Sequence, residues 1–175
     1  VSRMANIMPP LGLVSMAAVL DQNKIPNAVI DCYCHPDCQT MILDYVKENS
    51  PGFIGFSCTT SSFLDGIRIA RLVKAQAPDI KVIFGGPHVS ALEKSLMEAY
   101  EVIDYLVIGE GEATLTELLC AAQKDIGKIP GLVRIQRLIR NPRIAYALLG
   151  ADGALDCGPN ETILCGGSIG ALILS

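Results

Sequence analysis

The chain has 175 residues and a net charge of −4, from 14 Lys and Arg against 18 Asp and Glu, and half of its residues are hydrophobic. This length predicts about one domain with a substantial core, and the acidic balance excludes a basic face for nucleic acid and a polybasic membrane anchor. The longest weakly polar stretch, residues 5–20, is interrupted by Asn6, Pro9, Pro10 and Ser15, and the chain starts without a signal-peptide pattern. Neither a membrane span nor a secreted protein is therefore expected.

The first predicted element is a helix from about residue 11 to residue 22, entered at Pro10. Its apolar face is predicted from residues that recur at helical spacing: Leu11, Val14, Ala18 and, less regularly, Met16. A helix that packs on a sheet needs a strand leading into it, so a strand compressed into residues 3–8 is expected ahead of this helix.

Strands and helices then alternate with short connections. Apolar runs predict strands at residues 28–31, 53–58, 81–85 and 105–108. Amphipathic patterns predict further helices at residues 39–49, from the hydroxyl-rich turn to Pro78, at 90–99 with a Ser90–Glu93 capping box, and at 113–123. This alternation predicts an α/β fold: a doubly wound, flavodoxin-like (Rossmann-like) parallel sheet of four to five strands with helices on both faces.

Seven cysteines stand at positions 32, 34, 38, 58, 120, 157 and 165. An odd number in a chain without secretory features argues against a disulfide framework, and reduced thiols indicate the cytoplasm. Cys32, Cys34 and Cys38 gather around His35, and soft ligands so close together can hold a metal ion or an iron–sulfur cluster. Because they match no pair of CxxC motifs and no CxxxCxxC run, we favour three thiols at a strand-to-helix turn, and no metal ligand is predicted.

The predicted strand at 81–85 is apolar without polar alternation, which suits a strand buried on both faces, and it ends at Gly85-Gly86. Ligands bind at the carboxyl edge of open α/β sheets, and a residue without Cβ lets a ligand approach the backbone. A tight turn explains such a pair equally well when it is considered alone.

The neighbouring turns favour a ligand. Five hydroxyls in six positions exceed what one helix cap requires: Ser57, Thr59, Thr60, Ser61 and Ser62. The third turn is Gly109-Glu110-Gly111-Glu112, whose glycine spacing is typical of phosphate-cradling turns. Its carboxylates suit hydroxyl or amide donors better than phosphate, or serve as favourable charges at a helix start.

The α/β domain is predicted at residues 1–127, followed by an appended hairpin or linker at 128–145 in which LVRIQ and LIRN are short strands. Residues 146–175 form a glycine-rich, irregular tail in which only Ala171–Leu174 has the pattern of a strand.

Four motifs in a fixed order carry a resemblance to a known family. They are PPLGL at residues 9–13, the hydroxyl-rich turn after FIGFS, FGGPHVSA at 84–91 and VIGEGEATLTELL at 107–119. Together they resemble the cobalamin-binding domain that precedes the catalytic domain in cobalamin-dependent radical S-adenosylmethionine enzymes, which include methyltransferases and an anaerobic magnesium-protoporphyrin ester cyclase. The resemblance covers about residues 9–142.

The resemblance implies a cobalamin whose corrin ring lies across the carboxyl edge of the sheet and whose nucleotide tail reaches down beside the strands. The residues it implies as cofactor-binding are the hydroxyl donors Ser57, Thr59, Thr60 and Ser61, the wall residues Gly85, Gly86 and Pro87, and the edge residues Gly109, Glu110 and Gly111. No residue of this chain is expected to be a catalytic acid, base or nucleophile.

Two departures from the family pattern matter. The D-x-H-x-x-G motif that supplies a histidine ligand to cobalt is absent, since His35 lies in the wrong turn and Cys38 replaces the glycine, while His88 also stands elsewhere. A base-off cobalamin without a histidine lower ligand is therefore predicted. The CxxxCxxC run is also absent, because Met41 stands where a third cysteine after Cys34 and Cys38 belongs.

The [4Fe–4S] cluster and S-adenosylmethionine are accordingly expected only in a missing catalytic domain, which acts with this chain in cis or in trans. The leading hypothesis is a non-catalytic module that presents cobalamin to that radical S-adenosylmethionine domain for methyl transfer or related radical chemistry. The alternatives are a ligand-free structural or interaction domain of the same fold, and a flavodoxin-like binder of another nucleotide.

Overall fold

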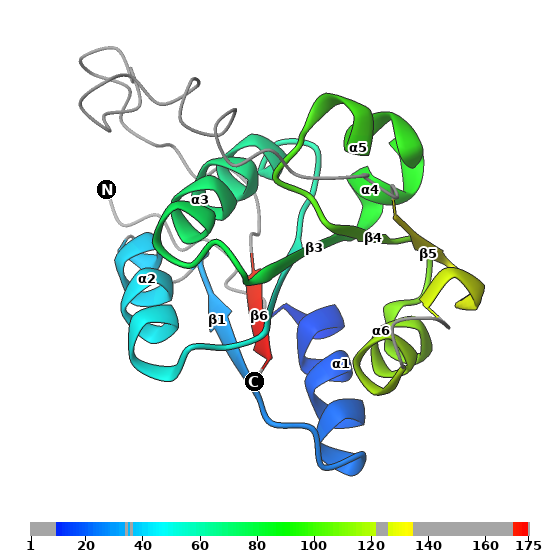
Figure 1. The fold of residues 1–175 in the computed structure, drawn as a ribbon, viewed down its shortest axis with the longest axis horizontal. Coiled ribbons are helices and arrows are strands. Elements are labelled where there is room, and N and C mark those ends of the chain that lie inside the picture. Colours follow the sequence, from blue (N-terminus) through cyan, green and yellow to red (C-terminus); the bar gives the residue numbers. More distant parts are fainter. Residues whose placement is uncertain (1–9, 34, 36, 122–125, 135–169, 175) are drawn as a thin grey trace, which may run out of the picture. The chain divides into compact units, whose positions relative to one another are not determined.

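The computed structural model describes residues 10–33, 35, 37–121, 126–134 and 170–174. These residues form one mixed sheet with helices on both faces (Figure 1). The helices are α1 (Leu11–Gln22), α2 (Cys38–Asn49), α3 (Phe63–Gln76), α4 (Pro87–Leu92), α5 (Lys94–Ala99) and α6 (Gly111–Cys120), with a 3-10 turn, η1 (Ile126–Lys128). None of the helices in these ranges has the length and apolar character needed to cross a membrane.

The sheet has six strands in the described part of the chain, in the order β1-β6-β2-β3-β4-β5. Their bounds are β1 (Asn27–Asp31), β2 (Phe53–Ser57), β3 (Lys81–Gly85), β4 (Tyr105–Val107), β5 (Leu132–Val133) and β6 (Gly170–Leu174). The first four run in one direction, whereas β5 and β6 are antiparallel to their neighbours. The doubly wound fold with a parallel core is therefore confirmed; β5 adds an antiparallel strand at one edge, and β6 is inserted between β1 and β2.

Each of the four strands predicted from an apolar run is present, with its ends shifted by at most one residue. The strand predicted near the end of the chain is β6, which lies between β1 and β2 and places Ile173 opposite both Ala28 and Ile54. β5 contains the start of LVRIQ and pairs with β4, so both late strands join the sheet of the α/β domain. The strand expected at residues 3–8 and the one at LIRN lie outside the described residues.

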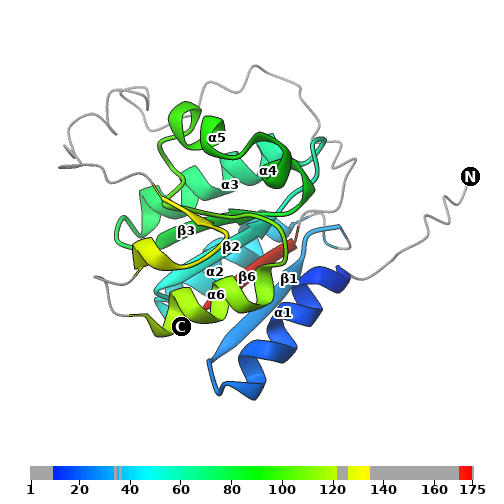
Figure 2. The same cartoon turned by 90° about the vertical axis from the view of Figure 1, so that its right-hand side faces the viewer.

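Two hydrophobic cores cover the two faces of the sheet. On one face, α1 and α6 pack against β-strand residues that include Ile83, Val107 and Leu172. On the other face, α2, α3, α4 and α5 pack around Phe56 and Phe84, whose ring centroids lie 5.1 Å apart. Figure 2 shows this division, with α3, α4 and α5 on one side of the sheet and α1 and α6 on the other.

The alternation of sides along β3 explains its uninterrupted apolar sequence. Val82 and Phe84 are fully buried on the face of α3, and Ile83 is 4% exposed on the face of α1 and α6. Burying each such side chain contributes about 1.5–3 kcal/mol. The prediction of a strand covered on both faces is therefore confirmed.

The prediction of which face of α1 is buried is wrong. Leu11 and Val14 are 63% and 49% exposed, whereas Leu13 and Leu20 are buried. Hydrophobic residues occur all round this helix, so their spacing alone could not select the side that meets the sheet.

The prediction of a single helix at residues 90–99 is also wrong. The segment forms two short helices, α4 and α5, which are separated at Glu93 by a backbone φ of 46°. Ser90 lies inside α4 instead of capping a helix, and its hydroxyl accepts a hydrogen bond of 3.1 Å from the Gly109 N–H. α6 begins at Gly111, two residues before the predicted start.

A partly buried ion pair at the amino edge of the sheet gives a test of this packing. Lys74 Nζ lies 2.8 Å from Asp104 Oδ2, which also accepts a 2.9 Å hydrogen bond from the Val82 N–H. Asp104→Asn removes the negative charge that pairs with Lys74 and weakens the hydrogen bond from Val82, so it should lower the free energy of unfolding by about 2 kcal/mol. Urea denaturation measures the change, and exposed Asp79→Asn is the matched control. Equal stabilities for the two variants would contradict this account.

Candidate ligand-binding site

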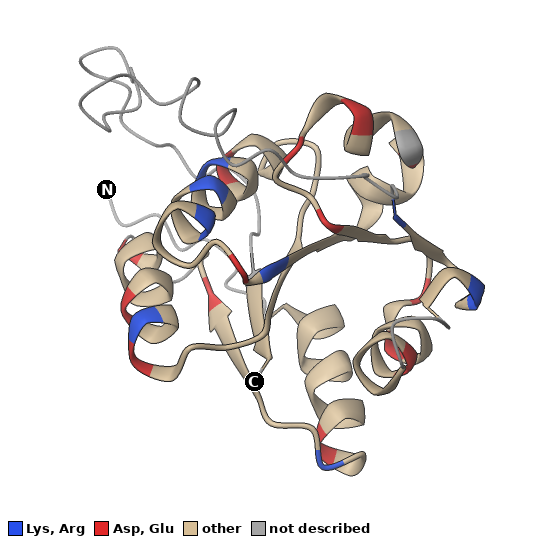
Figure 3. Cartoon of the chain, in the orientation of Figure 1, with Lys and Arg blue, Asp and Glu red and all other residues tan. Residues whose placement is uncertain are grey.

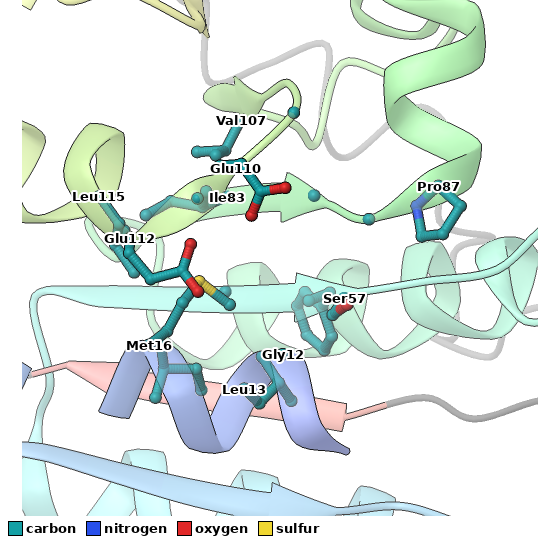
Figure 4. A pocket seen from close by; sticks show the side chains of 17 residues that line it. Gly12, Leu13, Met16, Ser57, Ile83, Pro87, Val107, Glu110, Glu112 and Leu115 are labelled. Carbon is teal, nitrogen blue, oxygen red and sulfur yellow. The ribbon is translucent and has the colours of Figure 1, made fainter. Parts of the chain in front are cut away.

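The strand ends meet at one edge of the sheet. The register places Ser57 opposite Gly85, and Gly170 opposite both Ser57 and Asp31, so the carboxyl ends of β1, β2 and β3 lie beside the start of β6. At this edge a cavity of about 230 Å³ opens between the sheet, α1 and α6. Figure 4 shows side chains from all three parts pointing into it.

The cavity has apolar walls and a glycine-rich rim. Its apolar side chains come from α1, the sheet and α6: Leu13, Met16, Ile83, Val107, Leu115 and Leu172. Phe56 also lines the cavity, but its ring packs against Phe84 on the other face of the sheet. The rest of the lining consists of glycines, one proline and three polar residues: Gly12, Gly55, Ser57, Gly85, Gly86, Pro87, Gly109, Glu110, Gly111 and Glu112. An apolar pocket with a few polar groups is the usual form of a small-molecule site.

Two glycines on the central strands keep the floor of the cavity open. A Cβ added at Gly55 would lie 3.6 Å from the Leu172 carbonyl oxygen, and one at Gly85 would lie 3.5 Å from the Val107 carbonyl oxygen. Both distances are ordinary contacts, so the fold itself leaves room for a side chain at either position. The space they leave is therefore available to a ligand.

Gly86 is required by the turn itself. Its φ of 98° and ψ of −178° belong to a region that essentially only glycine occupies. A Cβ here would lie 2.8 Å from the Cys58 carbonyl oxygen and 3.2 Å from Ser57 Oγ. The Cys58 N–H donates to the Gly85 carbonyl at 3.1 Å, so the turns after β2 and β3 touch through backbone atoms.

The polar groups of the cavity are neutral or acidic. Ser15 Oγ donates a 2.8 Å hydrogen bond to Glu112 Oε1 and thereby joins α1 to α6 beside the cavity. None of the described lining residues is Lys or Arg. Figure 3 shows no positive charge on either α1 or α6, whose sequences contain neither Lys nor Arg. The cavity therefore favours apolar groups and hydrogen-bond donors over phosphate.

Seven of the ten predicted cofactor-binding residues line this cavity: Ser57, Gly85, Gly86, Pro87, Gly109, Glu110 and Gly111. The other three do not, since Thr59, Thr60 and Ser61 lie in the turn between β2 and α3. There Thr59 Oγ1 lies 3.1 Å from both Ser61 Oγ and Ser62 Oγ, and Thr60 Oγ1 lies 3.2 Å from His88 Nδ1. The hydroxyl surplus is therefore used largely within the turn and by its neighbour in α4.

Neither histidine lines the cavity. The ring of His88 lies 4.5 Å from that of Phe63, on the far face of the sheet from α1 and α6. His35 is exposed in the turn after β1, where its carbonyl accepts a hydrogen bond from the Cys38 N–H. Among the described residues, no group of three His, Cys, Asp or Glu side chains has the arrangement of a metal site.

Several lining residues were missed from the sequence. Gly12, Leu13 and Leu115 stand inside two of the motifs, PPLGL and VIGEGEATLTELL, and could have been found there. Glu112 belongs to the third predicted turn but was not included among the predicted cofactor-binding residues. Leu172 could not, because nothing local to its sequence indicates that β6 pairs between β1 and β2.

The fold and the site define a flavodoxin-like α/β domain with a small-molecule cavity at its carboxyl edge. Residues 1–119 match the family model of the B12 binding domain, and the chain belongs to this family. The membership confirms the predicted resemblance, the fold class and cobalamin as the cofactor.

Curated relatives agree with this family. The chain is 32% identical over 116 residues to an uncharacterized methyltransferase of Pyrococcus horikoshii, covering 66% of this chain and 25% of the relative. It is 31% identical over 122 residues to the cobalamin-dependent radical SAM methyltransferase TokK of Streptomyces tokunonensis, covering 60% and 18%. It is 27% identical over 129 residues to an anaerobic magnesium-protoporphyrin IX monomethyl ester cyclase of Synechocystis sp., covering 71% and 26%. The chain thus spans about a quarter or less of these relatives.

Proposed function

We propose that this domain holds the nucleotide tail of cobalamin in the cavity between α1, α6 and the sheet, and so presents the corrinoid to a radical S-adenosylmethionine catalytic domain. The observation that carries the proposal is the glycine-rich cavity at the carboxyl edge of a B12-binding fold. Glycines from turns after two neighbouring strands leave backbone, not side chains, against the ligand.

The chemistry of the lining fits the base and sugar of such a tail. Leu13, Ile83 and Leu115 offer apolar contact to a flat aromatic base. The Ser57 hydroxyl and the Glu112 carboxylate suit hydroxyl and amide groups, and Ser15 holds Glu112 in place. The tail's phosphodiester would remain outside, because Glu110 and Glu112 are the charged groups of the lining.

The role of this chain is binding and orientation. Bound cobalamin supplies methyl-transfer or related radical chemistry, whereas the protein determines where the cofactor sits and which groups surround it. The [4Fe–4S] cluster and S-adenosylmethionine would belong to a separate domain, in cis or in trans. Two facts support that division: the Streptomyces tokunonensis relative is a cobalamin-dependent radical SAM methyltransferase, and this chain covers 18% of it.

Retention of corrinoid after desalting tests the proposal. The chain is incubated with hydroxocobalamin, passed through a desalting column and examined by visible spectroscopy and circular dichroism. Stoichiometric corrinoid on folded protein is expected. Colourless folded protein would contradict the proposal and favour an interaction domain, and retention of added flavin mononucleotide in place of cobalamin would favour the flavodoxin-like alternative.

The state of the bound cobalt gives a second prediction. Because neither His35 nor His88 lines the cavity, His35→Ala and His88→Ala should leave the visible spectrum of the bound cobalamin unchanged, in a base-off form. Both variants are measured beside the unsubstituted protein at equal corrinoid occupancy. Loss of a lower-ligand band in either variant would identify a histidine ligand and overturn the prediction.

A further inference from the structure

The turn between β1 and α2 brings two buried thiols together. Cys32 follows the last residue of β1, and Cys38 is the first residue of α2. Their side chains are 3% and 6% exposed, and neither is in a disulfide. Both belong to the same hydrophobic core, six positions apart across one turn, and Cys32 is the neighbour that acts most strongly on the Cys38 thiol.

The surroundings of Cys38 favour its thiolate. The hydrogen bond from Cys32 is the main cause that lowers the pKa of Cys38, and the Gln39 backbone N–H acts in the same direction. Burial and the negative charges of Asp37 and Asp65 oppose this effect without cancelling it. The thiolate is the nucleophile in thiol–disulfide exchange, so Cys38 is the attacking group of the pair.

Cys58 provides a comparison with Cys38 within the same chain. Cys58 is also buried, but burial raises its pKa to about 12, although a hydrogen bond from Ser62 lowers it in part. Cys58 therefore stays a thiol at neutral pH and does not attack a disulfide. Cys120 is exposed at the end of α6 and can be reached by an oxidant directly.

We propose that Cys32 and Cys38 form a reversible disulfide that ties the end of β1 to the first turn of α2. This modification site is independent of the proposed cofactor cavity, since neither cysteine lines it. The oxidant is a low-molecular-weight disulfide of the glutathione class.

The exchange proceeds in two balanced steps. The Cys38 thiolate attacks one sulfur of the oxidant, forms a mixed disulfide and expels one glutathione thiolate. The Cys32 thiol, on losing its proton, attacks the Cys38 sulfur and expels the second glutathione. The two protons released by the cysteines pass to the two departing thiolates, so two protein thiols are oxidised and one disulfide is reduced. Because both sulfurs are buried, the first step should be slower than the reaction of exposed Cys120.

Peptide mapping of the full chain tests the proposal. A Cys34→Ser variant leaves Cys32 and Cys38 as the cysteines of the tryptic peptide 25–47, and circular dichroism checks that it is folded. After treatment with oxidised glutathione, this peptide should lose the mass of two hydrogen atoms and regain it with dithiothreitol. The peptide 48–68, which holds Cys58, should stay reduced.

The matched variant Cys32→Ser, in the same background, removes the resolving thiol. It should stop at the first step, so that Cys38 carries one glutathione adduct. A peptide 25–47 that stays reduced under conditions that modify Cys120, or that carries separate glutathione adducts on both cysteines in the Cys34→Ser variant, would overturn the proposal.

Discussion

Gly86→Ala is expected to lower the free energy of unfolding by about 3 kcal/mol and to abolish retention of cobalamin. The backbone of Gly86 lies in a conformation that essentially only glycine adopts, and a Cβ would lie 2.8 Å from a backbone oxygen of Cys58. Such strain costs about 1–3 kcal/mol, and overpacking against backbone adds a similar amount. Relief of the clash would separate the turns after β2 and β3, which carry Ser57 and Gly85 at the rim of the cavity.

Gly12→Ala is the matched control for this variant. Gly12 also lines the cavity and gains the same single methyl group, but nothing lies within 4 Å of its added Cβ. Alanine in a helix is about 1 kcal/mol more favourable than glycine, so this variant should be as stable as the original protein or more stable. Thermal and urea denaturation give the two stabilities, and a Gly86→Ala variant as stable as Gly12→Ala would contradict the assignment of the turn.

Gly85→Leu is expected to weaken cobalamin binding by about 10- to 100-fold while the domain stays folded. Residue 85 stands on the cavity side of β3, where its added Cβ would make only ordinary contacts with Val107. The remaining carbons of leucine would occupy the space assigned to the nucleotide tail. Overpacking of about 1–3 kcal/mol converts to that range of affinity, since each 1.4 kcal/mol is tenfold.

Gly85→Ala provides the scale for this effect, because one methyl group at the same position fills far less of the cavity. Its affinity should lie between those of the original protein and Gly85→Leu. Titration of each variant with hydroxocobalamin, followed by visible spectroscopy, gives the order of affinities. Undiminished binding by a folded Gly85→Leu variant would show that the tail does not enter this cavity.

The strands of the parallel core were predictable because each is an apolar run that ends at a turn residue. β3 is the clearest case, since Val82, Ile83 and Phe84 alternate between two separate cores and therefore need no polar position. The place of β6 was not predictable. Its sequence indicates a strand, but its partners are Asn27–Asp31 and Phe53–Ser57, more than a hundred residues earlier in the chain.

The residues of the candidate site also include some that were predictable and some that were not. Gly85, Gly86 and Gly109 could be placed at the cavity from the sequence, because glycines at the ends of predicted strands let a ligand approach the backbone. Of the predicted hydroxyl donors, Ser57 lines the cavity, but Thr59 and Thr60 do not, because they bond to neighbours that only the folded turn brings near. The Glu112 carboxylate is held by a hydrogen bond from Ser15, which is 97 residues away in the sequence, and no local sequence pattern indicates that contact.

The nucleotide tail is the part of cobalamin that we place in the cavity. A direct test compares cobalamin with cobinamide, the corrinoid that lacks this tail, by equilibrium binding to the same preparation of protein. Apolar contact with Leu13, Ile83 and Leu115 is available only to a ligand that carries the base. We expect cobalamin to bind and cobinamide to bind far more weakly, whereas equal affinities for the two corrinoids would show that the cavity does not hold the tail.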